Sequence, residues 1–203
     1  MSSKAGNTLN WRSPWGGLFL TAFSVAGIYA ALSLLTSEMA ILEDPLTHLG
    51  CDLNPLIGCS ESILSPQAHL LGVSNSAVGL AAFSALFALG ATLMFGGALP
   101  RTVWVGLTAG AFVGIAFVAY FLFQSVTAFH SLCPYCLVTW AAALGVAPIM
   151  VGGAAASGSL GSAARPFGKS LLKYAWAVVL IGYMLVVLVV IFTMPDQVRA
   201  AFA

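Results

Sequence analysis

The chain has 203 residues, of which 60% are hydrophobic and only 6% are charged, and its net charge is +1. A soluble domain usually carries about a quarter charged residues, so this chain has too few to cover an aqueous surface. The composition therefore excludes an ordinary soluble protein and predicts a single membrane domain over residues 1–203. The near-zero charge gives no reason to expect a nucleic-acid partner.

Five apolar runs are long enough to cross a bilayer, which takes about 20 residues in a helix. The expected helices cover residues 16–37, 76–99, 102–129, 134–152 and 171–194. The first run is too long for the apolar part of a secretory signal, so we expect it to be retained. The predicted fold is thus an all-α integral membrane protein. Residues 39–75 are apolar enough to lie on the helices as a cap.

The basic residues predict the orientation, because cytoplasmic loops carry the excess of Lys and Arg. With five spans, six of the seven basic residues fall on the N-terminal side and only Arg199 falls on the other. The six are Lys4, Arg12, Arg101, Arg165, Lys169 and Lys173. We therefore expect a cytoplasmic N-terminus, which places all four cysteines on the outer side. That side is oxidising in a bacterial periplasm or a secretory lumen.

A CxxC motif, Cys133 to Cys136, opens the fourth expected helix. Pro134 follows Cys133, and proline is favoured at the first helical position, so Cys133 is expected to cap the helix with Cys136 one turn inside. The N–H groups and dipole at a helix N-terminus lower the pKa of a nearby thiol. The motif therefore predicts reactive thiols.

A second pair, Cys51 and Cys59, lies in the expected cap and can close a small disulfide ring. A modest movement of this loop would bring Cys59 to Cys133. Electrons could then pass from a partner dithiol through Cys51 and Cys59, then through Cys133 and Cys136, to a small acceptor. Each transfer would be the attack of a thiolate on a disulfide.

Three other interpretations of the four cysteines stay open. They are structural disulfides in an inert membrane protein, a tetrathiolate zinc site and a metal transporter. Zinc-binding pairs are usually two to four residues apart, whereas seven residues separate Cys51 from Cys59. A transporter normally carries ionisable residues within its spans, and the expected spans have essentially none.

Together these motifs resemble the vitamin K epoxide reductase family, and most of all its bacterial branch without a fused thioredoxin domain. The resemblance covers roughly residues 16–151 and rests on runs 51–55, 65–79 and 133–140. These runs hold a C-D-x6-C pair, an Asn-Ser at the head of the second helix and a CxxC that opens the fourth. In the DsbB-type quinone reductases, by contrast, the CxxC lies in the first external loop.

The resemblance implies a bundle of four helices around a quinone, with a fifth helix outside it. It also implies a role for each cysteine. Cys51 would exchange with the partner, and Cys59 would pass electrons to Cys133. Cys136 would be the thiolate that faces the quinone ring.

Three further residues match positions of the family's quinone site. Asn75 matches an asparagine that hydrogen-bonds a quinone oxygen, and Phe83 matches an aromatic residue of the pocket. Trp140 stands where animal members have a tyrosine. An indole N–H can donate a hydrogen bond but cannot serve as an acid, so simple quinone reduction fits better than a tyrosine-dependent epoxide reduction.

We therefore expect a thiol oxidase of the bacterial inner membrane. It would reoxidise a DsbA-like thioredoxin-fold protein in the periplasm and reduce ubiquinone or menaquinone. Because the chain stops at Ala203, the partner is expected to be a separate protein. The alternatives are reduction of vitamin K or its epoxide, as in animals, and a non-catalytic scaffold or transporter.

Two patterns lie outside the cysteine motifs. Gly106, Gly110 and Gly114 are spaced by four and predict a smooth helix face on which another helix packs closely. His130 lies one turn before Cys133, where it could hold a thiolate or simply face the interface. We assign no role to His69 in the cap.

Overall fold

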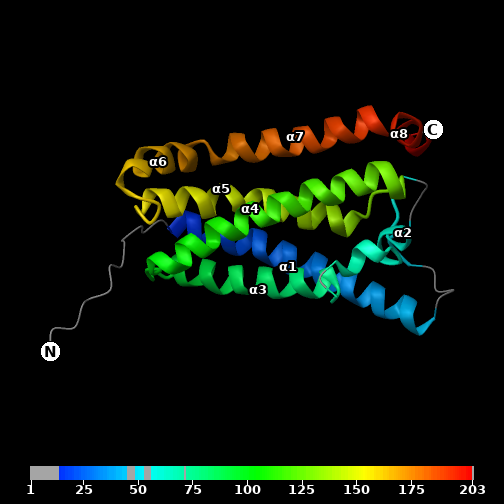
Figure 1. The fold of residues 1–203 in the computed structure, drawn as a ribbon, viewed down its shortest axis with the longest axis horizontal. Coiled ribbons are helices and arrows are strands. Elements are labelled where there is room, and N and C mark those ends of the chain that lie inside the picture. The colour runs from blue at the N-terminus through cyan, green and yellow to red at the C-terminus, as the bar shows by residue number, and fades with distance from the viewer. Residues whose placement is uncertain (1–13, 45–48, 53–55, 71, 203) are drawn as a thin grey trace.

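The computed structural model describes residues 14–44, 49–52, 56–70 and 72–202. Its main elements are five long helices that run side by side (Figure 1). They are α1 (Pro14–Glu43), α3 (Asn75–Met94), α4 (Arg101–Gln124), α5 (Pro134–Ala156) and α7 (Ala175–Thr193). Each is long and apolar enough to cross a membrane, which confirms the predicted all-α fold with five spans.

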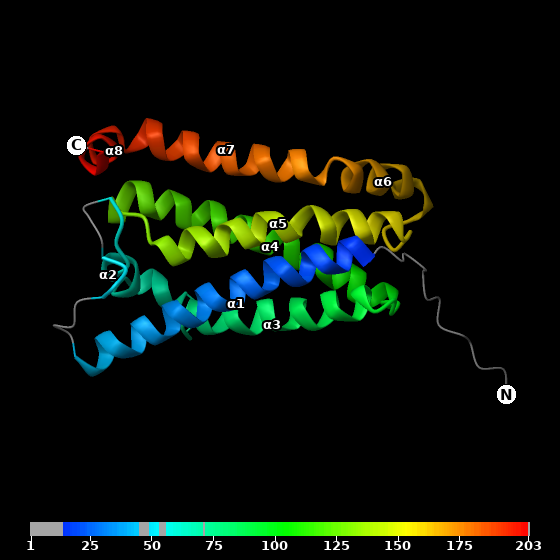
Figure 2. The same cartoon turned by 180° about the vertical axis from the view of Figure 1, so that it is seen from behind.

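Shorter elements lie at the two ends of the bundle. Helix α6 lies at one end, while α2 and α8 lie at the other (Figures 1 and 2). A π-helical turn, η2, extends α4, and two 3-10 turns complete the set. The bounds are α2 (Ser60–Ile63), η1 (Pro66–His69), η2 (Ser125–Phe129), η3 (Ser162–Ala164), α6 (Arg165–Lys173) and α8 (Pro195–Phe202).

Helix α5 is the central helix and contacts α1, α4, α6 and α7. In the apolar part of α5, 50% of the residues are buried inside the bundle, whereas in α7 only 6% are buried. Helix α7 lies along the outside of the bundle in both views (Figures 1 and 2). The Tyr183 hydroxyl ties it to α5 by donating to the Ala141 carbonyl oxygen at 2.9 Å. The architecture is therefore a bundle of α1, α3, α4 and α5 with one peripheral helix.

Close helix packing is found between α1 and α3. A Cβ atom at Gly17 would lie 2.4 Å from the backbone nitrogen of Met94, and one at Gly90 would lie 2.7 Å from Thr21 Oγ1. Only glycine allows the two backbones to approach so closely. This contact fixes the relative position of α1 and α3.

The packing face predicted for α4 is wrong. A Cβ atom at Gly106 or Gly114 would meet no atom within 4 Å, and one at Gly110 would meet only the Met150 methyl group, at 3.8 Å. Gly110 and Gly114 instead line a cavity. The missing side chains leave room for a ligand rather than for a helix.

Several helix ends differ from the expected ones. Helix α1 runs on to Glu43 instead of ending at residue 37, because the intervening acid, Glu38, finds partners in the cap. Helix α3 ends at Met94 instead of residue 99, because the chain turns at Gly96 with φ 79°. The fifth expected helix, 171–194, is divided at Tyr174 into α6 and α7.

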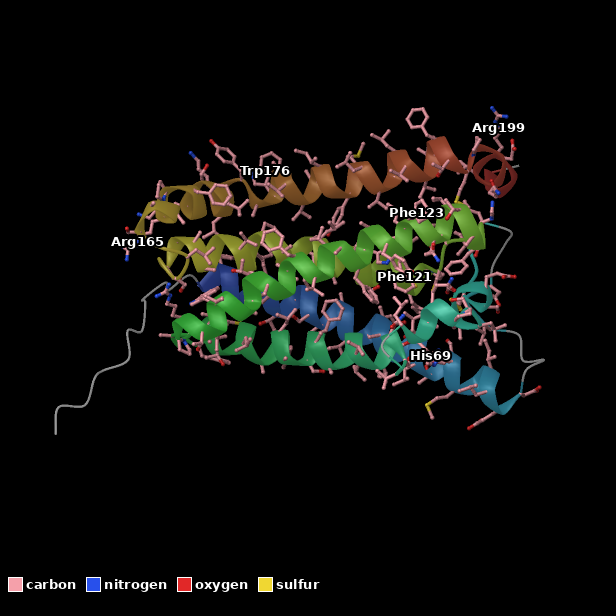
Figure 3. The ribbon with its side chains drawn as sticks, in the orientation of Figure 1. His69, Phe121, Phe123, Arg165, Trp176 and Arg199 are labelled. Atoms are coloured by element: carbon pink, nitrogen blue, oxygen red, sulfur yellow. A yellow bond between two sulfur atoms is a disulfide. The ribbon has the colours of Figure 1, made fainter. Side chains whose placement is uncertain are left out.

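The basic residues separate as the five-span count requires. Arg165, in α6, and Arg199, in α8, lie at opposite ends of the bundle (Figure 3). Arg101 begins α4, and its Nε donates to the Ser159 carbonyl oxygen at 2.9 Å, which ties it to the loop before α6. Lys4 and Arg12 lie outside the described residues. The cytoplasmic placement of the α6 end stays a prediction.

Candidate active site

Cys51 and Cys59 form a disulfide in the cap segment, residues 44–74, with 5.8 Å between their Cα atoms. Both side chains are buried. Asp52 holds the ring in place, because its Oδ1 accepts from the N–H of Cys59 at 2.6 Å and from that of Ser60 at 3.2 Å. These N–H groups begin α2, where a carboxylate is favoured. A Cβ atom at Gly58 would lie 3.0 Å from the same oxygen, so the ring closes tightly around it.

A short parallel bridge aligns the cap with the segment before α5. The Leu132 N–H donates to the Leu56 carbonyl oxygen at 2.7 Å, and the Gly58 N–H donates to the Leu132 carbonyl oxygen at 3.2 Å. Cys59 directly follows Gly58, and Cys133 directly follows Leu132, so the bridge places the two cysteines side by side. As a result, their Sγ atoms are 3.2 Å apart.

The start of α5 has the predicted geometry. Cys133 caps the helix in an extended conformation, and Pro134 is the first helical residue. The Leu137 N–H donates to the Cys133 carbonyl oxygen at 3.0 Å, closing the first turn. Cys133 and Cys136 are both free thiols, the former buried and the latter half-buried.

The environment of Cys133, which precedes the membrane-spanning part of α5, favours its thiolate. A hydrogen bond with the Cys136 side chain lowers the pKa of Cys133 most, and burial opposes it. Hydrogen bonds from the backbone N–H groups of Cys136 and Tyr135 and from the Ser62 side chain lower the pKa further. The net pKa lies below that of an ordinary thiol. Since the thiolate is the reactive form, Cys133 is suited to exchange with Cys59.

A cavity of about 360 Å³ lies among α1, α3, α4, α5 and the cap segment. Its wall is mostly apolar and includes Phe121 of α4 (Figure 3). The four residues predicted for a quinone site, Asn75, Phe83, Trp140 and Cys136, all line this one cavity. The structure thus brings them together, while their individual roles stay predictions.

Asn75 fits a quinone in this cavity. Its Nδ2 donates to the Gln67 carbonyl oxygen at 2.6 Å, which leaves one of its N–H bonds for a ligand. Its Oδ1 is buried and has no hydrogen-bond partner among the described residues. A quinone carbonyl could accept from the amide, and a hydroquinone hydroxyl could donate to this oxygen. The donor set and the apolar wall therefore suit both redox forms.

Phe83 and Trp140 are buried and supply two aromatic parts of the cavity wall. Phe83 packs directly on α1, since a Cβ atom at Gly27 would lie 2.4 Å from its ring. Trp140 packs in a cluster with Phe121 of α4 and Val190 of α7. Flat side chains held in this way suit a flat ring ligand.

Glu38 is a residue of the cavity that no sequence motif predicted. Glu38 is only 6% exposed and lines the cavity. Its Oε1 lies 2.9 Å from Nε2 of His69, a residue for which no role was expected. Its Oε2 accepts from the Ser74 hydroxyl and, at 3.3 Å, from the Ser76 hydroxyl. The only signal in the sequence was an acid inside a helical apolar run.

His130 is exposed and adopts a left-handed conformation with φ 53°. Its Nδ1 lies 3.3 Å from the Ala128 carbonyl oxygen, within its own turn. The geometry therefore gives no support to a role in holding the thiolate of Cys133.

The model of the vitamin K epoxide reductase family matches residues 18–151, well over half of the chain. No curated protein and no solved structure matches. The family consists of membrane oxidoreductases that act on disulfides and quinones, generally with thioredoxin-fold partners. The matched range contains all four cysteines and the other three predicted site residues.

Proposed function

Because the chain belongs to the vitamin K epoxide reductase family of oxidoreductases, we propose that it oxidises the dithiol of a soluble thioredoxin-fold protein and passes the electrons to a quinone. The observation that carries this proposal is the distance of 3.2 Å between Sγ of Cys59 and Sγ of Cys133. Cys136, one turn further along α5, lines the cavity. The two pairs thus form a series from the cap to the cavity.

The first step is exchange with the partner. A partner thiolate attacks Cys51, forms a mixed disulfide and releases Cys59 as a thiolate. The second partner thiol then attacks the mixed disulfide, which leaves the partner oxidised and both cap cysteines reduced. Cys51 is 5% exposed, so this step requires a local opening of the cap segment.

The second step moves the electrons inward. The Cys59 thiolate attacks Cys133 in a disulfide between Cys133 and Cys136 and releases Cys136 as a thiolate. Cys51 then attacks Cys59, which re-forms the cap disulfide and leaves the other two cysteines reduced. The lowered pKa of Cys133 favours its departure from Cys59. A cap disulfide beside two free thiols is the state reached at the end of this step.

The last step takes place in the cavity. A quinone bound there accepts two electrons and two protons and leaves as hydroquinone. Cys136 faces the ring, and the disulfide between Cys133 and Cys136 re-forms. Asn75 hydrogen-bonds one ring oxygen, while Phe83 and Trp140 hold the ring by packing.

We place the protein in a bacterial inner membrane with the cap in the periplasm. The partner is a DsbA-like protein, and the acceptor is ubiquinone or menaquinone. Support comes from the basic residues, since α6 lies at the end of the bundle opposite α2, which Cys59 begins, and Arg101 is hydrogen-bonded to Ser159 beside α6 (Figure 1). An excess of basic residues marks the cytoplasmic side.

Purified protein tests the proposal directly. With a reduced DsbA-like partner and a short-chain ubiquinone or menaquinone, it should consume one quinone for each dithiol oxidised. Cys136→Ala should abolish the consumption while leaving the cap disulfide able to exchange with the partner. Turnover of Cys136→Ala at the wild-type rate would overturn the proposal. Consumption of vitamin K epoxide in place of quinone would instead favour the animal-type reaction.

A further inference from the structure

The cavity wall contains a buried carboxyl group that the proposed relay of four cysteines does not use. Glu38 projects from α1 and is 6% exposed. Of the described residues that line the cavity, only Glu38 and Cys136 carry an ionisable side chain. A buried carboxylate is costly unless it is paired and hydrogen-bonded. A purely structural wall would be more stable with an apolar residue there.

The partners of Glu38 connect the cavity to the outside. Its Oε1 pairs with Nε2 of His69 at 2.9 Å, and the His69 side chain is 48% exposed. His69 lies on the cap side of the bundle (Figure 3). The Ser74 and Ser76 hydroxyls donate to the other carboxylate oxygen. A continuous hydrogen-bonded path therefore runs from solvent through an imidazole to a carboxyl group on the cavity wall.

The chemistry of the cavity requires such a path. Reduction of a quinone to hydroquinone consumes two electrons and two protons. Oxidation of the Cys133 and Cys136 pair supplies both electrons. The thiolate is the reactive form of a cysteine, so the reacting pair carries at most one proton. At least one proton must therefore come from another group.

We propose that Glu38 and His69 deliver this proton from solvent to a quinone oxygen. The inference rests on the proposed function. In the balanced step, one cysteine thiolate, one cysteine thiol, one quinone and the proton held by Glu38 and His69 give one disulfide and one hydroquinone. His69 then takes a new proton from solvent. The titratable groups on this path are Glu38 of α1, His69 of η1 and Cys136 of α5.

Glu38→Gln tests the proposal, because it keeps the shape and hydrogen bonding of the side chain but cannot release a proton. A positioned general acid contributes about 10²-fold or more to a rate, so we expect kcat for quinone reduction to fall by about 10²-fold. Glu43→Gln is the matched control, since Glu43 is an exposed acid at the end of the same helix, α1. The control is expected to keep the wild-type rate.

Four measurements separate proton delivery from a structural role. Quinone affinity of oxidised Glu38→Gln, and its thiol exchange with the partner in the absence of quinone, should both equal those of the wild type. The pH profile of kcat should differ in shape between the wild type and Glu38→Gln, which loss of a purely structural carboxyl group would not produce. His69→Gln should also lower kcat, because it interrupts the path between Glu38 and solvent.

The contrary results are equally specific. Wild-type kcat in Glu38→Gln across the pH range would overturn the proton role. So would a weakened quinone affinity with unchanged kcat, which would make Glu38 a positioning residue only. A wild-type protein that exchanges thiols but never reduces quinone would instead refute the proposed function itself.

Discussion

The chemistry at the level of single residues follows from the surroundings of each sulfur. Cys133 is buried between the cap and the start of α5, with Cys59 Sγ at 3.2 Å on one side and the Cys136 thiol on the other. Cys136 has the cavity beside it. In the proposed relay, Cys133 would therefore serve exchange and Cys136 quinone reduction, because only Cys136 lines the cavity.

The thiolate of Cys133 gives a prediction about pH. Its pKa is lowered, chiefly by the Cys136 side chain, so thiolate forms as pH rises through a value below that of an ordinary thiol, about 8.5. Attack of reduced Cys133 on Cys59 of the cap disulfide, which is the reverse of the proposed second step, should become faster over the same range and be flat above it. The ultraviolet thiolate absorbance of the wild type minus that of Cys133→Ser measures this titration. An ordinary thiol pKa in the folded protein would contradict the prediction.

The glycines of α4 give a prediction about the cavity. Gly114→Leu should fill space that a quinone needs and raise KM for quinone at least tenfold, with unchanged partner exchange. Gly106→Leu is the matched control, because a Cβ atom at either position meets nothing within 4 Å, but only Gly114 lines the cavity. Equal kinetics of the two variants would show that the quinone binds elsewhere.

The local chemistry of individual residues was predictable from sequence, but most of the contacts that position them were not. Pro134 at the first helical position was enough to place Cys133 at the helix cap. Cys59 was expected to reach Cys133 by a movement of the loop, whereas a bridge from the cap to Leu132, which no local pattern reports, already holds the two sulfurs 3.2 Å apart. Glu38 was missed for the same reason, since its partners come from a distant segment.

The helices themselves were predictable wherever hydrophobicity decides the structure. All five spans were found, because an uninterrupted apolar run has no other stable form in lipid. The ends were less accurate. Glu38 suggested the end of a span but lies within α1, and nothing in the sequence marks Tyr174 as the break between α6 and α7. A charged residue is therefore a weak signal of a helix end where tertiary contacts offset the cost of burying its charge.

Two glycines of α1 give matched predictions about packing. Gly17→Ala would place a Cβ atom against the Met94 backbone, which cannot move aside, so we expect a loss of about 1–3 kcal/mol in stability. A Cβ atom at Gly27 would have the Phe83 ring as its nearest neighbour, and Phe83 lines the cavity. Gly27→Ala should therefore displace this ring and weaken quinone binding. Thermal unfolding and quinone titration separate the two effects.

The two ends of the whole molecule differ in charge and in chemistry. The cations of α6 gather at one end of the bundle, and the cap disulfide lies at the other (Figures 1 and 3). The proposed exchange with the dithiol of a soluble periplasmic partner requires that the cap face the periplasm. The side chains around the cavity come from four helices and the cap, so only the assembled fold makes the site.

The orientation can be measured in intact bacteria with a membrane-impermeant thiol reagent. In a background without the four native cysteines, Glu61→Cys on α2 should be labelled in whole cells. Ser162→Cys, just before α6, should be labelled only after the cells are permeabilised. Both positions are exposed, so the difference reports the side of the membrane. The reverse pattern would place the cap in the cytoplasm.

The proposed relay requires that the two cysteine pairs exchange directly through Cys59 and Cys133. Replacing Cys51 and Cys136 by serine leaves only these two sulfurs, which lie 3.2 Å apart in the wild-type chain. Mild oxidation should then link them within one molecule, as a peptide pair that mass spectrometry identifies and that reductant releases. A double variant in which both sulfurs stay free, or link only between molecules, would contradict the account.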